Sequence, residues 1–152
     1  MTPEQKIAEL GLTLPEPAQP VGAYIPAVAS SNLIFTSGQI PVREGTLIAS
    51  GKVPTEVSAD VAKTAAVQAV LNALAAVKQT IGELSRVTRV VRMNMFVNSA
   101  PGFSDQAKIA NAASELLLAA FGDAGRHTRC ALGAAELPLS APVELDLIVE
   151  VQ

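Results

Sequence analysis

One arginine near the C-terminal end of the chain lies in a sequence context that requires an anionic partner. Arg129 opens a short stretch that is otherwise apolar, residues 129–134 (RCALGA). A buried guanidinium is very costly unless it meets an anion, so Arg129 needs an acidic neighbour or an acidic ligand. Glu144 opens the next β-forming stretch. Two interpretations stay open: a structural Arg129–Glu144 ion pair, or a fork that grips a ligand carboxylate with two parallel hydrogen bonds.

Other residue types that often carry chemistry are scarce or lack partners. The single cysteine, Cys130, and the single histidine, His127, cannot form a disulfide framework or a four-ligand zinc site. They are three residues apart on one short segment, and such neighbours rarely face each other as a catalytic pair. Neither phosphate-binding loop, GxxxxGK[ST] or GxGxxG, occurs, and Ser37 lacks the GxSxG elbow. On pattern alone, Tyr24 is a half-buried packing residue and Asn111 a solvent-facing helix residue.

The bulk composition indicates one small globular domain, residues 1–152. Of the 152 residues, 49% are hydrophobic and 16% are charged, and the net charge is −3. A mildly acidic chain with only five aromatic residues is a poor candidate for binding nucleic acid. The longest uncharged stretch, residues 17–42, contains four prolines, so no membrane span is expected. The first residues lack an apolar signal core, and we expect a cytoplasmic protein.

The N-terminal part predicts a short helix and an extended arm, together residues 1–21. Thr2 and Gln5 form a capping box around Pro3, which predicts a helix over residues 3–10. Prolines 15, 17 and 20 then favour an extended arm. Short strands are expected over residues 24–29, 33–37 and 47–49.

The rest of the chain alternates long helices with strands. Apolar residues at three- and four-residue spacing predict a helix over 55–81, and a second helix is expected over 104–121. Alternation predicts a strand over 87–97, with Val91, Met93, Met95 and Val97 on one face. Residues 128–134 and 143–151 are expected to form a hairpin-like pair. This order favours an α/β fold, a mixed sheet with two helices on one face, whose other face is covered by oligomerisation.

Four segments resemble the Rid/YjgF family of reactive-intermediate imine and enamine deaminases. They occur in the family's order from about residue 20 to the end: GAY at 22–24, FTSGQIP at 35–41, Asn111 in the second long helix, and Arg129 followed by LP at 137–138 and VELD at 143–146. The resemblance implies a chorismate-mutase-like fold and a homotrimer, in which three sheets form a central barrel with the helices outside. Ligand clefts then lie between subunits.

The same resemblance implies hydrolysis of 2-imino and enamine acids to 2-keto acids and ammonia. Carried over, Arg129 holds the substrate carboxylate and Glu144 positions or activates the attacking water. Tyr24 and Asn111 line the cleft, and the backbone of Ser37 and Gly38 contacts the ligand. No metal or organic cofactor is implied. A positive Arg129 close to Glu144 is expected to lower the pKa of that carboxyl, which favours water positioning over proton abstraction.

The sequence also departs from the family pattern and leaves other functions open. The family often has cysteine two positions after the arginine, where this chain has Ala131, with Cys130 beside it. The N-terminal helix and arm are additions to the family core. One alternative is the endoribonuclease activity in the family's older name, which the acidic charge disfavours. Another is a trimeric module that binds small carboxylates without turnover.

Overall fold

The chain is built around a five-stranded sheet, and the computed structural model describes all residues from 1 to 152. The strands lie in the order β1-β2-β7-β5-β6. Their bounds are Ala27–Ser30 (β1), Leu33–Thr36 (β2), Val87–Asn98 (β5), Thr128–Ala134 (β6) and Val143–Val151 (β7). Only β5 and β6 pair in parallel. The predicted mixed sheet is therefore confirmed. A separate small hairpin consists of β3 (Val42–Arg43) and β4 (Thr46–Leu47).

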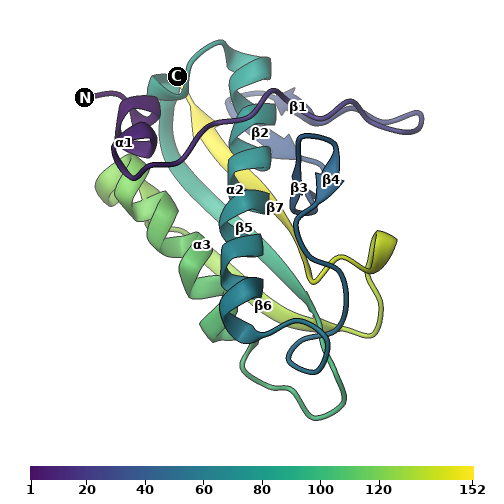
Figure 1. Cartoon of the computed structure of the whole chain (residues 1–152). Helices are drawn as coiled ribbons and strands as arrows, with labels where there is room; N and C mark the ends of the chain where they lie inside the picture. Colours follow the sequence, from purple (N-terminus) through teal and green to yellow (C-terminus); the bar gives the residue numbers. More distant parts are fainter.

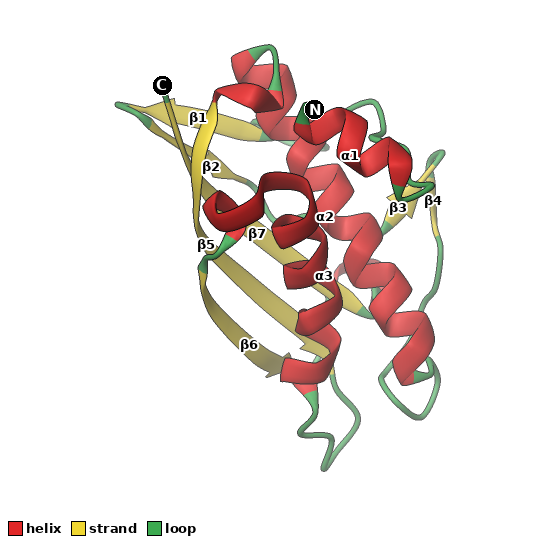
Figure 2. Cartoon of the chain, turned by 90° about the vertical axis from the view of Figure 1, so that its left-hand side faces the viewer, coloured by secondary structure: helices red, strands yellow, loops and turns green.

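Two long helices cover one face of this sheet, as predicted (Figure 2). They are α2 (Ala59–Ile81) and α3 (Gln106–Phe121). The expected starts at residues 55 and 104 were slightly early. The hydroxyl of Ser58 accepts a hydrogen bond from the Val61 amide and fixes the start of α2. Three short 3₁₀ helices complete the secondary structure, at Leu84–Arg86, Gly122–Gly125 and Pro138–Ser140.

Helix α2 is the central element of the core. It is long and apolar enough to cross a membrane, but 72% of its most apolar window is buried inside the protein. Many of its buried residues are alanines, which let the helix lie close to the sheet. From the sheet, alternate residues of β5 and β7, among them Met93, Met95, Leu145 and Leu147, meet the helices and are 0% exposed.

The expected pairing of the last two strands was wrong. Strands β6 and β7 do not pair with each other; β5 lies between them and pairs with both. The reason is the connection through α3. A β-α-β crossover places β6 parallel to β5 on its free side, so the antiparallel partner β7 takes the other side. This arrangement leaves β6 as an edge strand of the sheet.

The alternation within β5 is also interrupted. Its pairing with β7 shifts register between Val87 and Arg89 and again between Val90 and Arg92. As a result Val90 is fully buried, whereas Val91 is only partly buried and does not share the core face as expected. Such irregularities insert one residue and rotate the strand, and a residue pattern of period two does not reveal them.

The N-terminal segment is anchored on the helices. Helix α1 (Pro3–Glu9) begins with the predicted capping box, because Thr2 and Gln5 exchange hydrogen bonds. Ile7 is 1% exposed, and the Glu4 carboxylate accepts a hydrogen bond of 2.9 Å from the Leu84 amide. From residue 10 to residue 26 there is no helix or strand, as expected for an extended arm. Figure 1 shows this arm running from α1 across α2 towards β1 and the β3–β4 hairpin.

The other face of the sheet has no cover within the chain (Figure 2). Three large apolar side chains on it are exposed: Val28 at 47%, Phe35 at 38% and Leu132 at 52%. Phe35 lies beside Val28 and Ile148 in the strand register. An exposed apolar stripe on a sheet is typical of a surface that packs against another chain.

Candidate active site

The guanidinium of Arg129 lies at the edge of the sheet, between β6 and α3. Its Nη1 donates to Asn111 Oδ1 at 2.8 Å and to Ser114 Oγ at 3.1 Å. Arg129 is half-buried and forms no ion pair with any carboxylate of the chain. Since a guanidinium has five N–H donors, most of them stay free for a ligand. The two predicted residues Arg129 and Asn111 are therefore together, in a group that we call the arginine half-site.

A serine and a histidine that sequence reasoning did not assign to the site hold this group in place. His127 Nδ1 lies 2.7 Å from the Gly125 carbonyl oxygen, and its Nε2 lies 2.9 Å from Ser114 Oγ. The carbonyl can only accept, so the Nδ1 proton points to it. In the tautomer that carries only this proton, Nε2 accepts from the Ser114 hydroxyl, whose oxygen accepts from Arg129. The signal in the sequence is the spacing of Asn111 and Ser114, which places both on one face of a helix.

The second group consists of Glu144 and the residues around Gly38. Glu144 lies in β7, and Gln39 pairs with its neighbour Leu145 by two backbone hydrogen bonds. This pairing brings Gly38 against the Glu144 carboxylate: a Cβ on Gly38 would overlap Oε1 and stand 3.1 Å from the carboxyl carbon. The glycine thus lets the carboxylate lie directly against the backbone. We call Glu144 with Gly38 the glutamate half-site.

The environment of Glu144 raises its pKa above the ordinary value of a glutamate. The main cause is burial, which disfavours the charged form, and the second is the negative charge of Asp146. Within one chain Arg129 does not contribute to this shift, so the expected lowering of the pKa by Arg129 stays a prediction for a site in which the two residues meet. A carboxylate with a raised pKa is a better proton acceptor, which suits a general base.

Tyr24 and Ser37 lie on the same side as the glutamate half-site. The Ser37 hydroxyl donates to the Ile25 carbonyl oxygen at 2.6 Å, and the Ser37 backbone amide donates to the Pro26 carbonyl oxygen at 2.8 Å. These bonds fix the loop that carries Tyr24, whose side chain is 54% exposed. Tyr24 and Gly38 line one pocket.

The two half-sites do not meet within one chain, so the interpretation of an Arg129–Glu144 ion pair was wrong. In the strand register, Arg129 pairs with Met93, which pairs with Leu147 on its other side. Glu144 pairs with Phe96, three residues further along β5. Arg129 and Glu144 are thus two strands and three residues apart, roughly 14 Å along the sheet. They also project from opposite faces, because Arg129 faces α3 and Glu144 alternates with the buried Val143 and Leu145. The topology with β5 in the middle separates them.

Cys130 belongs to neither half-site. It lies on the open face of the sheet, where Arg92 Nη2 donates to its Sγ at 3.0 Å. Arg92 also donates to Asn94 Oδ1 at 3.0 Å, and Asn94 donates to Asp146 Oδ1 at 2.9 Å. His127 and Cys130 therefore face different partners on different sides. No group of three or more His, Cys, Asp or Glu side chains is placed to hold a metal ion.

Comparisons with known proteins agree with this architecture. The family described as "YjgF/chorismate mutase-like, putative endoribonuclease" matches residues 4–151. Protein TCP17 of Trypanosoma cruzi is 39% identical over 95% of this chain and 91% of its own length. A protein of Dermatophagoides farinae named 2-iminobutanoate/2-iminopropanoate deaminase is 30% identical over 93% of this chain and 95% of its own.

A solved structure extends the likeness to the whole fold. The crystal structure of Atu1372 from Agrobacterium tumefaciens, a protein of unknown function, has a TM-score of 0.92 and 41% identity. The alignment covers 99% of this chain and 92% of that one. The family match and these relatives span nearly all elements described above, including both half-sites. The chain belongs to the Rid/YjgF family and has its chorismate-mutase-like fold.

Proposed function

We propose that this protein hydrolyses 2-imino and enamine acids to 2-keto acids and ammonia, in a site formed between two copies of the chain. The observation that carries the proposal is the half-buried Arg129 guanidinium, which is positioned by Asn111 and Ser114 but has no acidic partner. A fork of free N–H donors fits the carboxylate that every 2-imino acid carries. The deaminase from Dermatophagoides farinae supports the reaction class.

In this proposal the glutamate half-site comes from the neighbouring copy. Arg129 lies at the edge strand β6, and the sheet face that bears Glu144 is open and carries exposed apolar side chains. Packing of two or three copies through this face buries the apolar stripe and brings Arg129 of one copy towards Glu144 of the partner subunit. A closed trimer forms three such sites.

The reaction needs only positioning and one proton acceptor. Arg129 binds the substrate carboxylate, and Glu144 of the partner subunit accepts a proton from water as the water oxygen bonds to C2. The electron pair of the C=N bond moves to nitrogen. The nitrogen takes the proton from the glutamate, which gives a carbinolamine. The glutamate then accepts the proton of the new hydroxyl group and passes it to the nitrogen, the C2=O bond forms as the C–N bond breaks, and ammonia leaves a 2-keto acid. Within one chain, burial and Asp146 raise the pKa of Glu144, which favours this acceptor role.

The first experiment measures imine hydrolysis directly. An amino-acid oxidase generates 2-imino acids in the presence of semicarbazide, and hydrolysis by this protein lowers the yield of semicarbazone. We expect the wild type to lower it and Arg129→Ala to have no effect, with both proteins folded and of equal oligomeric state. Wild-type protein that binds 2-keto acids but never lowers the semicarbazone yield would instead indicate a binding module without turnover.

A mixing experiment tests the shared site. Arg129→Ala and Glu144→Ala are each expected to be inactive. In randomly mixed oligomers about one quarter of the interfaces combine an intact arginine with an intact glutamate, so about that share of activity should return. A mixture that stays inactive although subunits exchange would refute a site between copies.

A further inference from the structure

A large pocket lies under the N-terminal arm, next to the glutamate half-site. It has a volume of about 1150 Å³, and its walls come from the arm, from the loop after β2 with the β3–β4 hairpin, and from helix α2. Tyr24 and Gly38 form part of its lining. This volume is slightly above the range of about 300–1000 Å³ that is usual for small-molecule sites. We call it the arm pocket.

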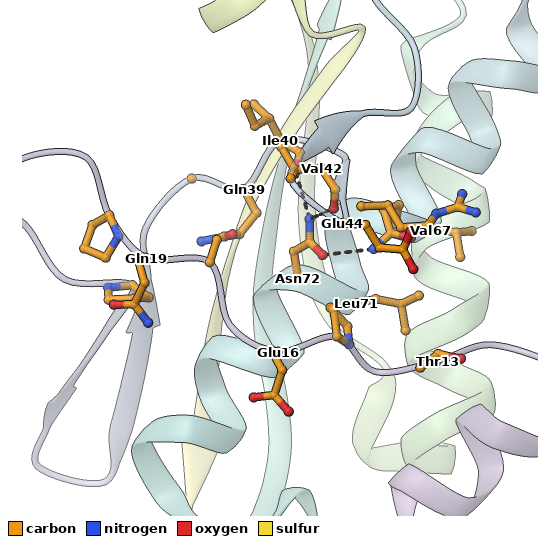
Figure 3. A pocket seen from close by; sticks show the side chains of 18 of the residues that line it. Thr13, Glu16, Gln19, Gln39, Ile40, Val42, Glu44, Val67, Leu71 and Asn72 are labelled. Atoms are coloured by element: carbon orange, nitrogen blue, oxygen red, sulfur yellow. Dashed lines mark hydrogen bonds between the residues drawn. The ribbon is translucent and has the colours of Figure 1, made fainter.

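The floor of the arm pocket is one face of α2. It consists of Thr64, Val67, Gln68, Leu71 and Asn72, and the spacing of three and four residues makes this a continuous stripe about 12 Å long. Figure 3 shows the side chains of Val67, Leu71 and Asn72 side by side between the arm and the loop that carries Ile40 and Val42. The floor has no charged residue.

The arm supplies the opposite wall, which is mainly apolar. Leu12, Pro15, Ala18, Pro20 and Val21 all contribute to it. Charged side chains occur only at exposed positions: Glu16 on the arm, and Arg43 and Glu44 on the hairpin. Because these charged side chains are of both signs and the floor is neutral, the pocket suits an apolar group rather than a charged one.

One buried polar side chain in the floor has a free acceptor. The Asn72 amide donates to the Ile40 and Val42 carbonyl oxygens at 3.0 and 2.9 Å, and it accepts from Gln68 Nε2 at 3.0 Å. Gln68 is only 7% exposed, yet its Oε1 accepts no hydrogen bond within the chain. This oxygen is not sealed off from solvent, so a ligand or water in the pocket can donate to it. Gln68 is therefore placed to meet a donor inside the pocket.

We propose that the arm pocket is the subsite for the substituent on C2 of the substrate, so that this protein acts on 2-imino acids with large, mainly apolar side chains. The inference rests on the proposed function and narrows its substrate class. It follows from Gly38, which lines the pocket and adjoins the Glu144 carboxylate, from the apolar walls, and from the size. A short side chain would leave most of the pocket in contact with water. A hydroxyl or amide near the end of a long side chain would donate to Gln68.

The test compares imines of increasing side-chain size on one oxidase–semicarbazide assay. Each methylene buried in an apolar site changes affinity by about fourfold. We expect kcat/KM for the imines of leucine, methionine and phenylalanine to exceed that for the imine of alanine by at least about tenfold. Val67→Trp fills the pocket from its floor, so it should abolish this preference while the alanine imine is still hydrolysed.

A matched control separates filling of the pocket from damage to the helix. Val61 also lies on α2, is 44% exposed and does not line the pocket, so Val61→Trp should leave the preference unchanged. If the wild type hydrolyses all imines at similar rates, or if both tryptophan variants act alike, the subsite proposal is refuted and the proposed function stands.

A binding measurement covers the case in which no imine is hydrolysed. The proposed function then fails, and the pocket is tested by calorimetry with 4-methyl-2-oxopentanoate and pyruvate. Tighter binding of the larger keto acid, lost in Val67→Trp and retained in Val61→Trp, supports the subsite. Equal or absent binding of the two keto acids refutes it.

Discussion

Gly38→Ala offers a sharp test of the glutamate half-site, because it moves one carboxylate without removing it. A Cβ at this position overlaps Glu144 Oε1, and the backbone of Gly38 has no positive φ that would strain an alanine. The overlapping atom is the end of a flexible side chain, so the fold can yield by turning the carboxylate away. We expect a displacement on the order of 1 Å and a loss of stability below about 1 kcal/mol.

The expected effect on activity is far larger than the effect on stability. A misplacement of about 1 Å in a catalytic group can cost roughly 100-fold in rate. We therefore expect kcat for imine hydrolysis to fall by about two orders of magnitude in Gly38→Ala. The free energy of unfolding in urea should stay close to that of the wild type.

A double-mutant cycle makes this prediction specific. If Gly38→Ala acts through the carboxylate, it should have little further effect in a Glu144→Ala background, because the two changes remove the same contribution. A fully active Gly38→Ala variant would refute the placement of Glu144 in the site. An equal loss in both backgrounds would show that the glycine acts through the loop.

Three further changes test the electrostatics, the arm and the open face. For Glu144 the folded-state pKa is raised, so its contribution to stability is complete below the ordinary carboxyl pKa and is lost as pH rises through the raised value. As pH rises from acidic to neutral, Glu144→Gln should therefore gain thermal stability relative to the wild type, and wild-type activity should rise. A stability difference between the two proteins that does not change with pH would contradict the raised pKa. Ile7→Ala should cost about 2–5 kcal/mol in urea unfolding, because Ile7 is 1% exposed and fixes α1 on the core; a smaller cost would mean that the arm is not anchored there. Phe35→Glu puts a charge into the exposed apolar stripe of the sheet and should shift the protein towards smaller species in sedimentation, with loss of activity; an unchanged mass would exclude this face as the contact between copies.

The sequence by itself determined the elements whose stability is local. The capping box of Thr2 and Gln5 and the apolar repeat of α2 depend on residues three or four positions apart, so a pattern in the chain is enough to predict them. The site residues followed from resemblance, and the pairing of Arg129 with Asn111 agrees with it. The alternation of buried and partly buried residues in β7 could also be predicted, because successive residues of a strand point to opposite faces.

Only the tertiary structure decided where these pieces lie relative to one another. Strand order depends on contacts between distant segments, and the crossover through α3 put β5 between Arg129 and Glu144. Because of this strand order, Arg129 and Glu144 form no ion pair within one chain, and each chain has two separate half-sites. The pKa of Glu144 in one chain then depends on burial and on Asp146. The irregular register of β5 and the position of the arm over α2 also arise from long-range packing, which no local pattern in the chain encodes.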